Sequence, residues 1–188
     1  MSRKKIFITL FILLPFVAKS QISTDEKPIS FRYDENMFKT RTVKTMPSID
    51  IEALKREDEE KDCDCPPRFG FPHKVYLNLE NSGEWFDLPD GKLWKLEISA
   101  PGTLSMNLLY DKFYLPEGAK FFVYSADRKQ SIGAFTSRNN KFTKDGKIRG
   151  FATSFIASDK IILEYYLPKD AKEQGIISIC DVVKQLLI

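Results

Sequence analysis

Residues 83–124 read GEWFDLPDGKLWKLEISAPGTLSMNLLYDKFYLPEGAKFFVY, and this stretch decides the fold. In residues 94–98 and 104–108 the apolar side chains occupy every second position, which is the pattern of a strand with one face toward a core and one toward solvent. Turns separate the strand-like runs at residues 88–91, 100–102 and 115–118. In each turn a proline presets φ and a glycine accepts backbone angles that other residues resist. The stretch therefore predicts the middle of a β-sandwich.

Further strands are predicted on both sides of this stretch. Residues 74–79 alternate apolar positions with Tyr76 and Asn78, and residues 119–125 form an apolar run typical of a central strand covered on both faces. The remaining candidates are 131–135, 150–157 paired as a hairpin with 160–167, and 175–183. About eight or nine strands with turns at roughly 8–12 residue spacing predict an all-β fold, a jelly-roll-like β-sandwich. A closed barrel is the alternative.

The composition fits one folded domain with a tail. The chain has 188 residues, of which 43% are hydrophobic and 13% aromatic, enough to bury one core but not two. The net charge is only +3, and acidic and basic residues are intermixed. Because nucleic-acid binding normally needs clustered Lys and Arg, no nucleic-acid partner is expected.

The N-terminus has the organisation of a secretory signal peptide. A basic segment, 2–5, precedes an apolar run, 6–17, and small residues stand before Gln21. The alternative is a membrane anchor, but the run is shorter than the ~20 residues that cross a bilayer, and Pro15 interrupts it. We expect residues 1–20 to be cleaved, leaving a secreted or periplasmic product that is not held in the membrane.

Residues 21–66 are predicted to be a mostly irregular linker or pro-region. Two short apolar groups, 28–31 and 46–49, could dock on a neighbouring surface. A short helix is expected near 50–62, where helix-forming residues follow Asp50, a suitable N-cap. Prolines at 66 and 67 end any regular structure in the linker, so the β-sandwich domain is predicted to span 67–188.

The chain has three cysteines, Cys63, Cys65 and Cys180, and one histidine, His73. In an oxidising compartment an odd number leaves at least one cysteine unpaired or paired between chains, and the spacing does not decide the pairing. A closed zinc site built on Cys63 and Cys65 would need both Cys180 and His73 as its remaining ligands. We favour a linker thiol pair, and we expect neither a metal nor a cofactor.

A series of short motifs carries a family resemblance. They are Pro67-Arg68-Phe69-Gly70, Gly83-Glu84-Trp85, Leu88-Pro89-Asp90-Gly91, Ser99-Ala100-Pro101-Gly102, Leu115-Pro116-Glu117-Gly118, Ile132-Gly133-Ala134-Phe135 and Leu163-Glu164-Tyr165-Tyr166-Leu167-Pro168. In order and spacing, over roughly 67–183, they resemble the N-terminal, non-catalytic region of secreted lysyl-endopeptidase-like serine proteases of Bacteroidetes-type bacteria. In that family the region precedes a trypsin-like domain. The resemblance implies a truncated or stand-alone copy that packs against a protease domain, in cis or in trans, or assists it.

The family's catalytic machinery is not recognisable in this chain. A Ser-His-Asp triad needs a histidine to take the proton of the serine. His73, the only histidine, precedes the first strand of the predicted sandwich, and no Gly-Asp-Ser-Gly-Gly-like turn follows it. We therefore predict a protein that is not an enzyme and name no catalytic residue.

Two other function classes are considered. The first is an extracellular module that binds carbohydrate or calcium, with stacking and oxygen ligands from Trp85, Trp94, Tyr110, Tyr114 and Tyr124, and from Asp87, Asp90, Asp111 and Asp127. Core packing of the aromatic residues and turn formation by the aspartates are the favoured explanations. The second is glycoside hydrolysis by Glu97 and Glu164, for which solvated charges on the outer face of a sandwich are the simpler explanation.

Overall fold

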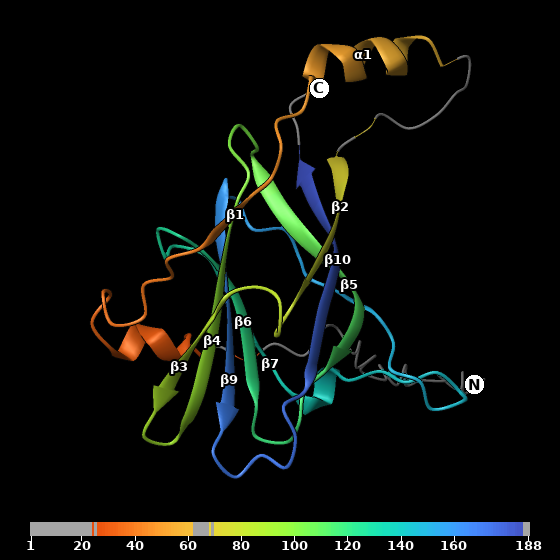
Figure 1. Ribbon diagram of the computed structural model, residues 1–188. Coiled ribbons are helices and arrows are strands. Elements are labelled where there is room, and N and C mark those ends of the chain that lie inside the picture. Colours follow the sequence, from red (N-terminus) through yellow and green to blue (C-terminus); the bar gives the residue numbers. More distant parts are fainter. Residues whose placement is uncertain (1–23, 25, 62–67, 69, 186–188) are drawn as a thin grey trace, which may run out of the picture.

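The computed structural model describes residues 24, 26–61, 68 and 70–185. The predicted signal peptide, Cys63 and Cys65 lie outside these residues. The described chain is all-β, with a six-stranded and a four-stranded sheet facing each other (Figure 1). The sequence-based expectation of an all-β, two-sheet fold is confirmed.

The six-stranded sheet has the order β1-β4-β9-β6-β7, and β3 shares the edge of β4 with β1. Its strands are β1 (Val43–Thr45), β3 (Glu84–Leu88), β4 (Gly91–Ser99), β6 (Lys120–Ser125), β7 (Ser131–Phe135) and β9 (Lys160–Pro168). β1 runs parallel to β4 and the other pairs are antiparallel. The long central pair, β4 with β9, places Trp94 opposite Tyr165 and Lys95 opposite Glu164.

The four-stranded sheet has the order β2-β10-β5-β8 and is antiparallel throughout. Its strands are β2 (Gly70–Asn78), β5 (Ser105–Tyr114), β8 (Phe151–Ala152) and β10 (Ile176–Gln185). The register of β10 shifts between Ile179 and Asp181 against both neighbours. Such a bulge bends the strand and increases its twist.

The core lies between the sheets and follows the predicted alternation. Trp94, Leu96 and Ile98 of β4 face inward and are completely buried. Trp94 also donates its indole N–H to the carbonyl oxygen of Ser82 at 2.8 Å, so this large side chain is buried without losing its hydrogen bond. Residues 121–124 of β6 are all buried. The prediction of a central strand covered on both faces is confirmed.

Two strand predictions are wrong. Residues 150–157 and 160–167 do not form a hairpin, because β8 pairs with β5 in the four-stranded sheet while β9 pairs with β4 and β6 in the other. Ile156 still forms a bridge with Met106 of β5, so the chain changes sheets only after this residue. Leu104, predicted on the buried face of a strand, precedes β5 and is 48% exposed.

The part of the predicted linker from residue 28 to Met46 is packed on the sandwich. Residues 28–38, which we call the strap, include the 3-10 helix Ile29–Arg32 and cross the outer face of the six-stranded sheet. Ile29 and Phe38 of the strap are buried in a second apolar cluster with Leu93 and Phe122 of the sheet. The apolar patch on this face of the sheet is therefore covered by the chain itself.

Beyond the strap the chain continues along the same sheet. β1 lies beside β4, and Met46 enters the core between the sheets. Helix α1 (Ile51–Glu59) lies within the range predicted for a helix, and Asp50 caps it by accepting the backbone N–H of Ala53 at 2.9 Å. In the part of the chain that the structure describes, no helix combines the length and apolar character needed to cross a bilayer.

The strap also buries charged residues. Glu164 is 0% exposed, and it accepts the backbone N–H of Ser30 at 3.1 Å and the Ser30 hydroxyl at 2.5 Å. Lys95 is 5% exposed and donates to the carbonyl oxygen of Phe38 at 3.0 Å. The expectation that Lys95 of β4 and Glu164 of β9 are solvated is wrong, because the strap covers both side chains and supplies their hydrogen-bond partners.

Candidate functional site

The aromatic residues proposed for ligand stacking are buried or hydrogen-bonded within the protein. Trp94, Tyr110 and Tyr124 are at most 3% exposed. Trp85 is half-buried and donates its indole N–H to the Leu79 carbonyl oxygen at 3.2 Å. Tyr114 donates its hydroxyl to Glu173 at 2.5 Å. These five rings pack or hydrogen-bond within the protein, and they do not form an exposed stacking surface.

The four proposed oxygen ligands are exposed turn and strand residues that do not converge. One of them, Asp127, accepts the Ser125 hydroxyl at 2.6 Å and the Lys129 backbone N–H at 3.2 Å. These hydrogen bonds, the hydroxyl first, lower the pKa of Asp127 to about 2. Among the described residues no three His, Cys, Asp or Glu side chains are grouped as metal ligands would be. The four aspartates proposed as calcium ligands are therefore not part of such a group.

The carboxylates considered for glycoside hydrolysis do not share an open cleft. Glu97 and Glu164 both lie on the outer face of the six-stranded sheet, but Glu164 is beneath the strap. The Tyr124 hydroxyl also donates to Glu164, at 3.1 Å. Burial raises the pKa of Tyr124 strongly, and the nearby Glu164 charge adds to the rise. Substrate cannot reach the carboxylate of Glu164 while the strap is in place.

The histidine and the described cysteine lie in the four-stranded sheet. His73 is on β2, and its ring contacts that of Phe71 edge-on, with 5.1 Å between the ring centroids. Burial, and then the charge of Lys184, lowers the pKa of His73. Cys180 is on β10, unpaired among the described residues, and its thiol donates to the Leu109 carbonyl oxygen at 3.4 Å. Burial is the main cause of the raised pKa of Cys180.

Two of the family-like turns meet the end of β9 at one end of the sandwich, which we call the turn end. Lys169 donates its backbone N–H to the Asp90 carbonyl oxygen at 2.9 Å, and the Tyr166 hydroxyl donates to the same oxygen at 3.1 Å. Gly118 lies so close to Pro168 that a Cβ on it would be 3.1 Å from the proline ring. The turns at 88–91 and 115–118 are thus both held against the end of β9.

A mostly apolar recess of about 280 Å³ opens at the turn end. We call it the turn-end recess. It is lined by Asp87, Leu88, Pro89, Gly91, Lys92, Leu167, Pro168, Lys169 and Ala171. Most of these residues belong to two of the motifs that carry the family resemblance, although the motifs are far apart in the sequence. The sequence did not indicate that they adjoin.

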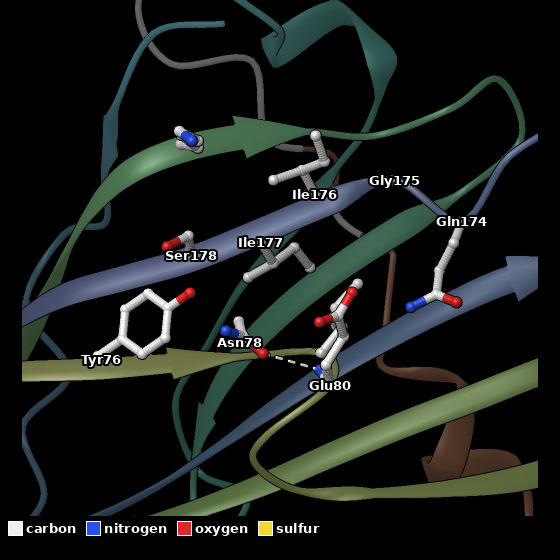
Figure 2. A pocket seen from close by; sticks show the side chains of 10 residues that line it. Tyr76, Asn78, Glu80, Gln174, Gly175, Ile176, Ile177 and Ser178 are labelled. Carbon is white, nitrogen blue, oxygen red and sulfur yellow. Dashed lines mark hydrogen bonds between the residues drawn. The ribbon is translucent and has the colours of Figure 1, made fainter.

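A second recess, of about 260 Å³, lies on the outer face of the four-stranded sheet. We call it the Tyr76 recess. Figure 2 shows Tyr76 and Asn78 on β2 beside Ser178 on β10, with Glu80 and Gln174 toward one end. Its other lining residues are Leu79, Lys112, Gly175, Ile176 and Ile177. The Tyr76 ring is 72% exposed.

Sequence reasoning did not select the Tyr76 recess, although one signal for it was present. In residues 74–79 the alternation assigns Tyr76 and Asn78 to the solvent face. A large aromatic residue on a solvent face has no core-packing explanation. The stacking residues proposed from the sequence lie in the aromatic-rich strands instead, and most of those side chains are buried.

Comparison with known proteins adds no family assignment. No protein-family model matches the sequence. No solved structure is significantly similar to this fold.

Proposed function

We propose that this chain is an exported, non-catalytic domain related to the N-terminal region of lysyl-endopeptidase-like serine proteases, and that it packs against a trypsin-like protease domain. The jelly-roll connectivity and the secretory signal are part of this proposal. The observation that carries it is the turn end, where family-like motifs from separate parts of the chain build one recess. Motifs needed only for separate turns have no reason to line a common apolar surface.

The turn-end recess is suited to docking because its walls are fixed before a partner arrives. The hydrogen bonds to the Asp90 carbonyl oxygen tie the first turn to β9. A preformed apolar recess loses little conformational entropy on binding, so more of the burial contributes to affinity. We propose that a protease domain, in cis or in trans, inserts an apolar side chain here, and that the contact assists its folding or delays its activity.

The test is refolding of a homologous lysyl-endopeptidase-like protease domain in the presence of the purified chain. The expected result is a higher yield of folded protease, or a delayed onset of its activity. Ala171→Arg places a long charged side chain in the recess and should abolish the effect. Ala53→Arg makes the same change on helix α1 and should leave the effect intact.

Two outcomes would count against the proposal. If the wild-type chain changes neither yield nor activity, the assistance role is wrong. If Ala171→Arg and Ala53→Arg behave alike while both remain folded by circular dichroism, the partner does not bind at the turn-end recess.

A further inference from the structure

We infer that the Tyr76 recess is a binding site for a single, uncharged sugar ring. The inference does not rest on the proposed protease role, because the recess is lined by different residues from the turn-end recess. It rests on the alignment of three strands, on polar groups without partners, and on the balance of charge.

Strand register places three polar side chains in one row. Ser178 of β10 pairs with Asn78 of β2 on one side and with Lys112 of β5 on the other. Side chains directly opposite on one face of a sheet are about 4.5–5.5 Å apart at Cβ. Tyr76 stands two residues from Asn78 on the same face, so the row adjoins an exposed aromatic ring (Figure 2).

Several polar groups that line the recess have no hydrogen-bond partner in the described part of the chain. Ser178 is only 8% exposed, yet its hydroxyl makes no hydrogen bond there, and neither does the side-chain amide of Gln174. Asn78 uses its side-chain oxygen for the backbone N–H groups of Glu80 and Asn81, both at 2.9 Å, which leaves its NH₂ group available. Among the described residues, the completely buried side-chain atoms without a partner do not include the Ser178 hydroxyl, so this group is open to solvent and to a ligand. A ligand with both donors and acceptors would satisfy these groups.

The charges at the recess oppose each other. Glu80 and Lys112 both line it, and neither carboxylate nor ammonium makes an ion pair with another described residue. One negative and one positive group favour neither an anion nor a cation. The available donors and acceptors are otherwise the neutral hydroxyls and amides of Tyr76, Ser178, Asn78 and Gln174. This set suits a ligand that carries several hydroxyl groups and no net charge.

The apolar part of the recess completes the match. The Tyr76 ring offers a flat face, and Ile176, which is 40% exposed, lies at the same recess. The less polar face of a pyranose ring packs on such a surface while its hydroxyls reach the surrounding donors and acceptors. A volume of about 260 Å³ is just below the ~300 Å³ at which pockets for drug-sized molecules begin. The recess therefore fits one ring, either free or at the end of a chain.

The test is saturation-transfer NMR on the full chain with free glucose, galactose, mannose, rhamnose, xylose and N-acetylglucosamine, followed by titration of those that bind. We expect at least one sugar to bind, with the strongest transfer from one face of its ring. Tyr76→Ala should weaken binding about tenfold, because it removes the apolar aromatic face on which the sugar ring packs. Ser178→Ala should weaken it less, and Tyr76→Phe should retain most of it.

The matched control is Phe142→Ala, which removes another exposed aromatic side chain, 51% exposed and outside the recess. It should leave sugar binding unchanged, as should Ala171→Arg. Binding of none of the sugars would overturn the inference. Sugar binding that neither Tyr76→Ala nor Ser178→Ala weakens would also overturn it. So would a wild-type chain that binds no sugar but binds a protein partner that Tyr76→Ala no longer binds. Because Tyr76 is largely exposed, its truncation should not unfold the domain, and circular dichroism checks this.

Discussion

Replacing Ser30 by alanine tests whether the strap is a structural part of the domain. The change removes the hydroxyl that donates to the Glu164 carboxylate at 2.5 Å, but it keeps the backbone N–H that donates at 3.1 Å. The Tyr124 hydroxyl also remains in place, 3.1 Å from the same carboxylate. The change therefore removes one of three hydrogen bonds to a completely buried carboxylate, together with the 3.3 Å contact between the Ser30 and Tyr124 hydroxyls.

The expected magnitude follows from that geometry. A hydrogen bond to a charged group contributes about 1.5–3 kcal/mol, and Glu164 has no access to water that could replace it. We expect Ser30→Ala to lower the free energy of unfolding by about 2 kcal/mol, which for a domain of this size corresponds to a fall in Tm of about 4–8 °C. Amide hydrogens of the strap should also exchange faster, because local opening becomes easier.

Urea unfolding and amide hydrogen exchange provide the measurements. Ser48→Ala is the control, because Ser48 is exposed and a surface change of this kind alters stability by no more than about 0.5 kcal/mol. If Ser30→Ala is as stable as Ser48→Ala and the strap exchanges at the wild-type rate, the strap is not anchored through Glu164. The account of the buried charges would then be wrong.

Two other predictions concern a glycine pair and the single histidine. Gly83 and Gly102 both have positive φ, but a Cβ on Gly83 would lie 2.4 Å from the Lys95 carbonyl oxygen, whereas nothing lies within 4 Å of one on Gly102. Gly102→Ala should lower the free energy of unfolding by about 1–2 kcal/mol, and Gly83→Ala should lower it by at least about 2 kcal/mol more. Equal urea midpoints for the two variants would contradict this. Because the pKa of His73 is lowered in the folded state, the unfolded chain binds the proton more tightly, and stability is lost as pH falls from 6.5 toward the folded-state pKa. His73→Gln should flatten this dependence in urea unfolding across that range, and an unchanged slope would show that His73 is not its source.

The core-facing side chains of the strands, and the turns between strands, could be predicted because both depend on local sequence pattern. The alternation at Trp94, Leu96 and Ile98 identifies a strand and its buried face without any knowledge of its neighbours. The apolar run at 121–124 identifies a strand covered on both faces in the same way. The turn residues at 88–91 and 115–118 mark strand ends because proline and glycine have strong local preferences.

What covers a strand cannot be predicted so easily. Lys95 and Glu164 look like solvent-facing residues by their chemistry, and only the strap makes them buried. The strap has no periodic signal, because its buried residues Ile29 and Phe38 are separated by mostly exposed ones. The partner of β8 was also missed, because pairing depends on contacts between distant segments and not on the composition of the strand.

The same distinction between local pattern and distant contacts applies to the candidate sites. Core packing explains the buried rings of Trp94 and Tyr124, as the sequence-based interpretation favoured. The Tyr76 recess combines β2 with the start of β10, which lie about a hundred residues apart in the sequence. Its position follows from strand order, and strand order is the part of a β-sandwich that a single sequence constrains least.

The strap also has a consequence for the order in which the molecule assembles. Ser30 and Glu164 are separated by 134 residues, so the strap has no carboxylate to bind until β9 has been made. Contacts of such long sequence separation form late and slow the folding of β-rich domains. A ribosome releases the strap early, yet it must wait, unburied, for β4, β6 and β9 to pair. The strap precedes every strand of the sheet that it covers, yet it is among the last segments to be enclosed. A chain held before that step would still present Lys95 and Glu164 to water.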